Sequence, residues 1–173
     1  MWVGPPPEAI TAMADKIAAK QAATDAGVPN LPWALLSGEA EAGWRRDVEP
    51  LGYPVVVKAA AGSGGHGIRL VQSPDELADA VHATRQEAGA RFANAAVFVE
   101  RWLPASHHVE IQVLADAHGG MVHLGERECS IQRRHQKLIE EAPSPNITPE
   151  MRTRMTEAAL ALTERIGRTG PGA

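Results

Sequence analysis

The chain has 173 residues, a length that leaves room for one ordinary domain or two small lobes. Hydrophobic residues make up 44% of it and charged residues 22%, and this composition excludes a disordered chain. A net charge of −4 excludes a general electrostatic attraction to nucleic acid or to an anionic membrane surface. The single cysteine, Cys129, excludes an internal disulfide. No apolar run reaches the roughly 18–20 residues that cross a bilayer, and we expect a cytoplasmic protein.

A helix is predicted over residues 7–26. Proline suits the first helical position, and Ile10, Met13 and Ile17 fall on one face of such a helix. Gly27 can adopt the left-handed conformation that ends a helix. The sequence therefore opens with a long amphipathic helix.

The next segments predict a hairpin and a long helix. Residues 53–58 are apolar and largely β-branched, which indicates a buried strand, and residues 68–71 suit its hairpin partner. A less regular helix is expected over 39–51. The Ser-Pro-Asp-Glu sequence at 73–76 has the form of a capping box, so that a helix should run from there to residue 92.

Strands alternate with loops in the second half. Strands are expected over 96–99, 108–113 and 121–124, followed by a polar loop over 126–145 and a last helix after Thr148. Hairpins and helices are thus mixed without strict βαβ alternation, which indicates an α+β fold.

A glycine-rich stretch follows the strand that ends at Lys58. Residues 62–67 read Gly-Ser-Gly-Gly-His-Gly, and small residues let backbone N–H groups close around phosphate oxygens. A lysine at the end of the preceding strand suits the same anion. The stretch is neither a Walker A motif nor a Rossmann fingerprint, and a plain solvated hairpin is the alternative interpretation.

A second cluster lies at residues 126–137, where three Arg, one Lys and one His stand among carboxylates. Cationic, planar donors at this density can hold a polyanionic ligand or transition state. A solvated, self-neutralising loop is the simpler interpretation. A nucleic-acid surface is disfavoured by the negative net charge and by the absence of interleaved aromatic residues.

Taken together, these motifs resemble the biotin carboxylases, the ATP-grasp part of acyl-CoA carboxylases and of pyruvate carboxylase. The resemblance runs from Gly4 to about Gly167. The segments that carry it are 13–16 (Met-Ala-Asp-Lys), 53–58 (Tyr-Pro-Val-Val-Val-Lys) with the glycine loop, 99–103 (Val-Glu-Arg-Trp-Leu), 108–113 (His-Val-Glu-Ile-Gln-Val), and 128–143, which contains Cys-Ser-Ile-Gln-Arg-Arg-His-Gln-Lys.

The resemblance implies an ATP-grasp fold of α+β class, truncated at both ends relative to the family. The implied parts are an N-terminal helix and connector over 1–32, a lid lobe with the glycine-rich loop over 33–103, the first part of a second lobe over 104–167, and a flexible tail over 168–173.

The resemblance also implies a role for each matching residue. Lys137 is the catalytic candidate, placed near bicarbonate and the γ-phosphate. The candidates for nucleotide binding are Lys16 and Lys58 at the phosphates, Gly64 and Gly65 in the loop that closes over them, Glu100, Arg101, Trp102 and Leu103 at the adenine, and His108, Gln132 and His135 in the wall of the site.

The implied reaction is the carboxylation of biotin with ATP, Mg²⁺ and bicarbonate, through carboxyphosphate. The implied partners are a biotinylated carrier domain and a carboxyltransferase component, whereas the oligomeric state is left open. No metal ligand maps onto this chain, so the magnesium carboxylates are expected outside it and the isolated chain is expected to be inactive. The alternatives are a catalytically dead nucleotide-binding module and another ATP-grasp ligase, of the carbamoyl-phosphate synthetase type.

Overall fold

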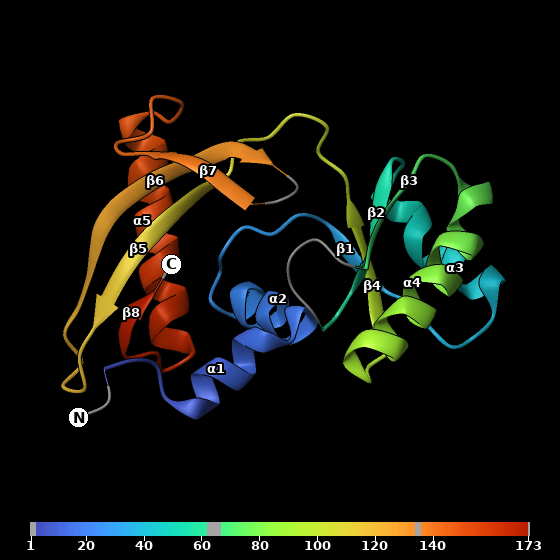
Figure 1. Ribbon diagram of the computed structural model, residues 1–173, viewed down its shortest axis with the longest axis horizontal. Coiled ribbons are helices and arrows are strands. Elements are labelled where there is room, and N and C mark those ends of the chain that lie inside the picture. The colour runs from blue at the N-terminus through green and yellow to red at the C-terminus, as the bar shows by residue number, and fades with distance from the viewer. Residues whose placement is uncertain (1–2, 62–66, 134–135, 173) are drawn as a thin grey trace. The chain divides into compact units, whose positions relative to one another are not determined.

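The computed structural model describes residues 3–61, 67–133 and 136–172. The chain forms two compact units (Figure 1). The insert unit is the continuous segment Leu31–Pro104, and the outer unit combines Met1–Asn30 with Ala105–Ala173. Within the described ranges, no helix is both long and apolar enough to cross a membrane.

The insert unit contains a four-stranded antiparallel sheet with the strand order β1-β4-β2-β3. Its strands are β1 (Trp33–Leu35), β2 (Val55–Ala59), β3 (Ile68–Val71) and β4 (Val97–Arg101). Its helices are α3 (Glu41–Val48) and α4 (Leu77–Phe92), with short 3₁₀ turns η1 (Glu49–Leu51) and η2 (Pro74–Glu76). The predicted strands over 53–58, 68–71 and 96–99 are confirmed to within two residues.

The helices cover one face of this sheet. Val55 and Val57 of β2 are fully buried in a core that also contains Trp44 of α3 and Leu77 of α4. Because side chains alternate between the two faces of a strand, Lys58 lies on the opposite face of the sheet. The core thus fixes which way Lys58 points.

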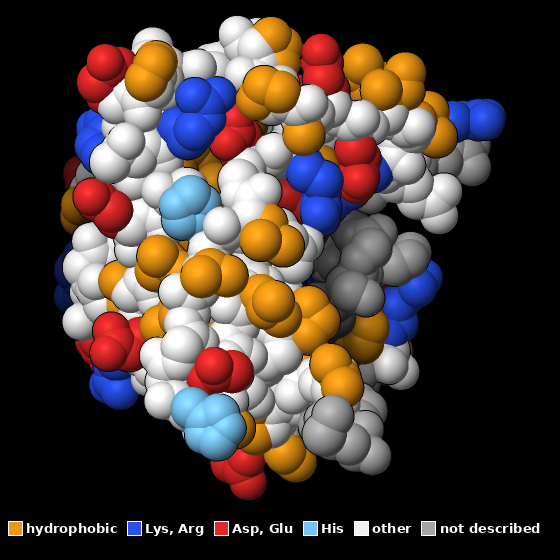
Figure 2. Space-filling view, turned by 90° about the vertical axis from the view of Figure 1, so that its left-hand side faces the viewer, with side chains coloured by type: hydrophobic (Ala, Val, Ile, Leu, Met, Phe, Trp, Pro, Cys, Tyr) orange, Lys and Arg blue, Asp and Glu red, His pale blue; other side chains and the backbone are white. Residues whose placement is uncertain are grey.

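The outer unit contains a second antiparallel sheet, with the strand order β7-β6-β5-β8. Its strands are β5 (Val109–Ala115), β6 (Met121–Arg133), β7 (Gln136–Glu141) and β8 (Gly170–Gly172), and its helices are α1 (Pro7–Ala14), α2 (Lys16–Asp25) and α5 (Pro149–Arg165). Helix α5 contacts both β5 and β6. Figure 2 shows one face of the molecule, on which hydrophobic side chains stand among charged ones.

The predicted helix over 7–26 is wrong at one point, because it divides at Asp15. This residue is extended (φ −92°, ψ 118°), and its Oδ1 accepts hydrogen bonds from the backbone N–H groups of Ile17 at 2.7 Å and Ala18 at 3.0 Å. An N-cap of this kind starts a new helix, and here it makes Lys16 the first residue of α2.

The predicted polar loop over 126–145 is also wrong in its first part. Residues 126–133 continue the long strand β6, and β7 pairs with it. The polar side chains of these strands bind one another across the sheet, so polarity here does not mark a loop. The expected flexible tail likewise differs: Gly170–Gly172 forms β8 beside β5.

Candidate functional site

Lys58 and Glu100 form the polar centre of the insert unit. They stand on the neighbouring antiparallel strands β2 and β4, and Lys58 Nζ donates to Glu100 Oε1. The Glu100 side chain is only 7% exposed, whereas Lys58 keeps 26% of its side chain exposed. Since a buried carboxylate needs a partner, the pair holds the lysine ammonium at a fixed place on the face of the sheet opposite to the helices.

The chain leaves the sheet after Arg101, the last residue of β4, and its backbone is anchored at this point. The N–H of Arg101 donates to Pro32 O at 3.0 Å, and the N–H of Trp102 donates to Pro54 O at 3.1 Å. The side chains of Trp102 and Leu103 are 38% and 42% exposed. This segment therefore offers apolar side chains and fixed backbone groups directly beside the Lys58–Glu100 pair.

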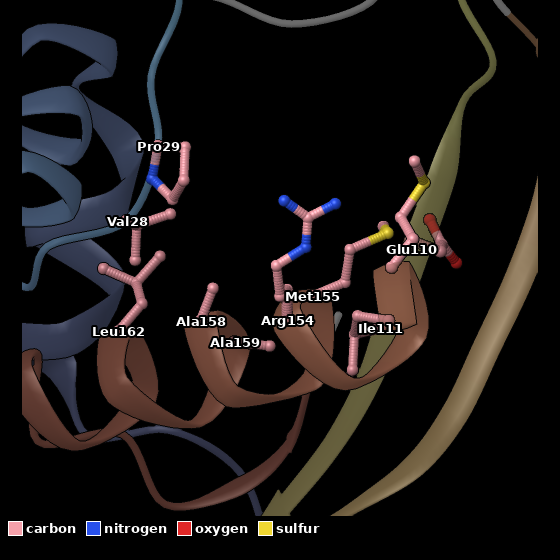
Figure 3. Close-up of a pocket in the computed structure, with 10 residues that line it drawn as sticks. Val28, Pro29, Glu110, Ile111, Arg154, Met155, Ala158, Ala159 and Leu162 are labelled. Atoms are coloured by element: carbon pink, nitrogen blue, oxygen red, sulfur yellow. The ribbon is translucent and has the colours of Figure 1, made fainter. Parts of the chain in front are cut away.

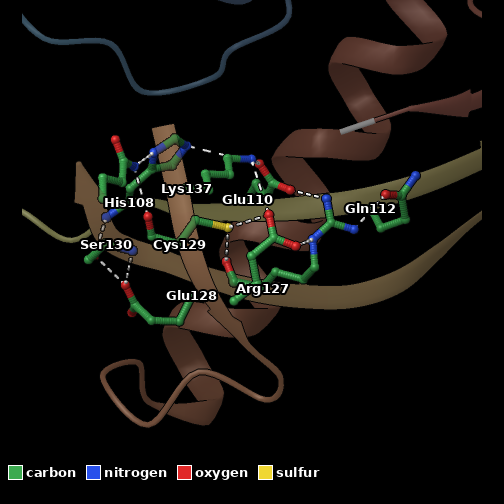
Figure 4. Close-up of polar contacts among 10 residues, drawn as sticks. His108, Glu110, Gln112, Arg127, Glu128, Cys129, Ser130 and Lys137 are labelled. Carbon is green, nitrogen blue, oxygen red and sulfur yellow. Dashed lines mark hydrogen bonds and ion pairs between the residues drawn. The ribbon is translucent and has the colours of Figure 1, made fainter. Parts of the chain in front are cut away.

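A second polar cluster lies on the sheet of the outer unit, centred on Glu110 of β5 (Figure 4). Its carboxylate accepts hydrogen bonds from Arg127 of β6 and from Lys137 of β7. Arg127 also donates from a terminal nitrogen to Gln112 Oε1 at 2.9 Å, and Lys137 Nζ lies 3.8 Å from Glu140 Oε1. Three adjacent strands thus bring two cations to one carboxylate.

These contacts change the acidity of the groups involved. Burial raises the pKa of the Glu110 carboxyl, but the donors Lys137 and Arg127 outweigh it and hold that pKa below its usual value. The hydrogen bond to Glu110 raises the pKa of Lys137. Burial raises the pKa of the neighbouring Cys129 thiol. At neutral pH the cluster therefore contains a carboxylate, an ammonium and a neutral thiol.

His108 and Gln132 belong to the same cluster. Gln132 Nε2 lies 2.7 Å from His108 Nδ1 and 2.7 Å from the carbonyl oxygen of Cys129. On its other side, His108 Nε2 lies 4.0 Å from Glu110 Oε2, which also accepts from Lys137. The structure thus brings together three of the predicted site residues, namely His108, Gln132 and Lys137.

The remaining predicted residues are placed as follows. Lys16 begins α2 in the outer unit and is half-buried. Gly64, Gly65 and His135 lie outside the described residues.

Sequence reasoning missed the acidic members of the cluster. Glu110 lies within the predicted strand over 108–113 without a predicted role, yet it is the residue that both cations contact. Glu126 and Glu128 of β6 are also missed: their exposed fractions are only 4% and 7%. Glu126 accepts from Arg152 of α5 at 2.8 Å, which ties the last helix to the sheet. A signal existed only for Glu110, which stands between Val109 and Ile111 in a predicted strand.

One group of three potential metal ligands comes together in the described part of the chain. Ligand atoms of Glu110, Cys129 and Glu140 all lie within 4.8 Å of one another. However, Arg127 and Lys137 contact both carboxylates, and the thiol is neutral. Mg²⁺ prefers several oxygen ligands, so this group does not fit a magnesium ion.

An apolar hollow of about 500 Å³ lies between α5, β5 and the Val28–Pro29 segment of the outer unit (Figure 3). Met155, Ala158 and Leu162 of α5 point into it. Its charged lining residues are Arg154 and Glu110 alone among the described residues. This composition does not suit a triphosphate, so the polar clusters are the better candidates for nucleotide contacts.

Comparison with known proteins identifies the family. The family described as carbamoyl-phosphate synthase L chain, ATP binding domain, matches residues 15–173, which include both polar clusters. The chain belongs to this family. The fold is accordingly part of an ATP-grasp domain, as the resemblance implied.

The relatives of this ATP-binding domain carry the names of biotin-dependent carboxylases. It is 47% identical to a biotin carboxylase of Nostoc over 171 residues, covering 99% of this chain and 38% of the relative. It is also 47% identical to a pyruvate carboxylase subunit of Methanothermobacter thermautotrophicus, covering 98% of this chain and 35% of the relative. The chain thus spans little more than a third of the length of these relatives.

Solved structures agree with this assignment. The ATP-binding domain matches the biotin carboxylase of Campylobacter jejuni, solved as a complex with a β,γ-ATP compound, with a TM-score of 0.91 and 40% identity over 97% of this chain and 38% of the other. It matches the biotin carboxylase domain of the 2-oxoglutarate carboxylase of Hydrogenobacter thermophilus with a TM-score of 0.89 and 38% identity, over 97% of this chain and 37% of the other. That second structure contains MgADP, ADP and bicarbonate.

Proposed function

We propose that this chain is the nucleotide-binding part of a biotin carboxylase. The observation that carries the proposal is the Lys58–Glu100 pair, which holds an ammonium beside an anchored apolar segment in a member of an ATP-binding family.

The reaction that we propose for the whole protein has two steps. A bicarbonate oxygen attacks the γ-phosphorus of ATP, ADP leaves, and carboxyphosphate forms. The ureido nitrogen of biotin then attacks the carboxyl carbon, loses its proton, and inorganic phosphate leaves.

In this proposal the insert unit binds ATP through charge and shape. Lys58 supplies a charged hydrogen bond to the phosphates, while Gly64 and Gly65 belong to the loop that approaches them. Glu100 and the backbone of residues 101–103 read the polar edge of the adenine. Trp102 and Leu103 supply apolar contact to its ring.

The cluster of the outer unit has a separate proposed task. Lys137 faces the oxygens of bicarbonate and of the transferred phosphoryl group, where negative charge has to be neutralised. His108, Gln132 and His135 supply hydrogen bonds to the nucleotide, and Lys16 supplies a further cation. Glu110 holds Lys137 in its charged form, as the raised pKa of that lysine indicates.

Mg²⁺ would neutralise charge between the phosphates. No group of carboxylates in the described ranges suits it, so we expect this chain to bind ATP without hydrolysing it in a bicarbonate-dependent way. The partners that we propose for the whole protein are a biotinylated carrier domain and a carboxyltransferase component. A ligase of the carbamoyl-phosphate synthase type is the second candidate, which the family description favours and the carboxylase names of the relatives disfavour.

Calorimetric titration of the 173-residue chain with ATP tests the proposal. Lys58→Met should weaken ATP binding about 10- to 150-fold, the effect of losing a charged hydrogen bond of about 1.5–3 kcal/mol. Lys20→Met, which removes an equal charge from α2, is the control and should bind like the parent chain. Equal affinity of the Lys58 variant and the parent chain would refute the role of this pair.

A further inference from the structure

The first two helices of the chain meet at Asp15 and do not continue into each other (Figure 1). Helix α1 ends at Ala14, and α2 begins at Lys16. Between them Asp15 has φ −92° and ψ 118°, an extended conformation that lies outside the α-helical range. A single residue therefore separates the two helices and makes Lys16 the first residue of the second.

The side chain of Asp15 satisfies backbone groups that this break exposes. The first N–H groups of a helix have no partner within the helix. Asp15 Oδ1 accepts from two of them, the N–H of Ile17 at 2.7 Å and the N–H of Ala18 at 3.0 Å. The N–H of Ala19 donates to the carbonyl oxygen of Asp15 at 2.9 Å. One residue thus supplies both the side-chain cap and the first backbone acceptor of α2.

The neighbouring sequence gives no other reason for a break. Residues 12–19 read Ala-Met-Ala-Asp-Lys-Ile-Ala-Ala, a stretch without glycine or proline. Alanine has the highest helix propensity of all residues, whereas aspartate is favoured at the N-cap. With alanine at position 15, the helical pattern would run without interruption from α1 into α2. The break therefore depends on the side chain of Asp15.

The far end of α2 is held independently of Asp15. Arg165 Nη2 of α5 lies 3.6 Å from the Oδ2 atom of Asp25, the last residue of α2. Ala23, one turn from this end, is buried, and α2 contacts both α1 and α5. Because the far end is fixed, the cap decides at which residue the helix begins and hence where Lys16 lies.

The break also decides where the side chain of Lys16 can extend. Helical side chains tilt toward the N-terminus, over the residues three and four positions earlier. In a continuous helix Lys16 would lie along the turn that contains Ala12 and Met13. As the first residue of α2, we expect it to extend past the N-terminal end of that helix, where the helix dipole also favours an anion.

We infer that Asp15 is a positioning residue for nucleotide binding, which caps α2 and so places the Lys16 ammonium beyond the helix end, where it can meet the phosphates of ATP. This inference deepens the proposed function and rests on it for the role of Lys16. Asp15 itself does not contact the ligand in this inference. By its charge alone, a carboxylate next to a phosphate-binding lysine would weaken anion binding, so the cap and not the charge has to explain its effect.

The conformation of residue 15 can be measured in the free protein by its ¹³Cα chemical shift, which moves in opposite directions in helical and in extended backbone. We expect an extended residue 15 in the parent chain and in Asp15→Asn, since asparagine caps helices as well as aspartate does. In Asp15→Ala this residue should be helical. A helical residue 15 in the parent chain, or an extended one in Asp15→Ala, would overturn the inference.

Calorimetric titration with ATP tests the functional part. Asp15→Ala should weaken ATP binding roughly 2- to 30-fold, the range that corresponds to the loss of one helix cap. Asp15→Asn should bind at least as tightly as the parent chain. Equal changes in the two variants, in either direction, would show that the charge of Asp15 matters and not its cap.

Thr148→Ala is the matched control, because it removes the N-cap of another helix in the same unit. Thr148 Oγ1 accepts from the N–H of Met151 in the first turn of α5, at 3.2 Å. Loss of this cap should leave the affinity for ATP unchanged. A loss of affinity as large as that of Asp15→Ala would mean that general destabilisation, and not the position of Lys16, weakens binding.

A double-mutant cycle tests whether Asp15 acts through Lys16. Lys16→Met should weaken ATP binding at least as much as Asp15→Ala, and the double variant should bind like Lys16→Met alone. Additive losses would refute action through Lys16. An unchanged Lys16→Met, or an unchanged Asp15→Ala beside a weakened Lys16→Met, would refute the inference and leave the proposed function standing, because Lys58→Met tests that function separately.

Discussion

Glu128 of β6 and Ser144 of the segment before α5 are joined by a hydrogen bond of 2.9 Å between the carboxylate Oε2 and the hydroxyl. The same carboxylate accepts from Ser130 and from Asn146 Nδ2, the latter at 3.2 Å. The hydrogen bond from Ser130 is the main reason that the pKa of Glu128 falls to about 2, against an ordinary value of 4.5. One buried carboxylate thus fastens the β7–α5 connection to the sheet.

This network predicts acid sensitivity of the outer unit. Because the folded-state pKa of Glu128 is lowered, its contribution to stability is complete above about pH 4.5 and is lost as the pH falls toward 2. The free energy of unfolding, measured by urea denaturation at a series of pH values, should decrease through this window. In Glu128→Gln, which cannot ionise, part of that decrease should disappear.

The matched control is Glu141→Gln, which changes an exposed carboxylate of β7. It should keep the acid sensitivity of the parent chain. A difference between the parent chain and Glu128→Gln that stays constant from pH 6 to pH 2 would contradict the assigned role of Glu128.

We expect substitution of Trp44 to destabilise the insert unit strongly. It is fully buried, its indole Nε1 donates to Gly38 O at 3.1 Å, and the guanidinium of Arg85 lies 4.8 Å from its ring. Trp44→Ala should lower the free energy of unfolding by about 3–5 kcal/mol, the range for removing a large buried aromatic. Leu70→Ala, at an exposed position of β3, should cost far less in the same urea titration.

Gly67 directly precedes β3, and both its backbone conformation and the nearby Ala59 disfavour any side chain at this position. Its φ is +65°, and a Cβ there would lie 2.9 Å from Ala59 Cβ. Gly67→Ala should cost about 1–3 kcal/mol of stability. Gly52→Ala is a sharp control, because Gly52 has a similar φ of +68° with nothing within 4 Å. Equal losses in the two variants would show that crowding at Gly67 contributes nothing.

Substitutions of Lys137 and of Lys58 should differ in how strongly they weaken ATP binding. Lys137 is already paired with Glu110 and Glu140 in the free protein, and its proposed role is with bicarbonate and the transferred phosphoryl group. Lys137→Ala should change the dissociation constant of ATP by no more than about fivefold, as for exposed ion pairs. A loss as large as that of Lys58→Met in calorimetry would assign Lys137 to nucleotide binding instead.

The sequence predicts the parts of the fold in which one physical signal dominates. The β-branched run at 53–58 has no competing interpretation, and it forms β2 with Lys58 on the predicted strand. The break at Asp15 has no such signal, because alanine and apolar residues continue the helical period on both sides of it. The strand β7 was missed because four of its six side chains are polar and its two apolar residues, Leu138 and Ile139, are adjacent and not alternating.

The Glu110 cluster shows why part of the site is beyond sequence reasoning. Glu110 binds a partner 17 residues away and another 27 residues away, and neither spacing corresponds to a periodic pattern. Only the pairing of β5 with β6 and of β6 with β7 brings the three side chains together. The residue types indicated an anion site, but not which carboxylate organises it.

The insert unit begins and ends on neighbouring strands. Trp33 near its start is the register partner of Glu100 near its end, and the N–H of Arg101 donates to Pro32 O. The polypeptide therefore enters and leaves this unit at one place. A gene segment encoding such a unit has a single point of entry and exit to be joined, which makes Leu31–Pro104 a natural module for exchange between related ATP-binding domains.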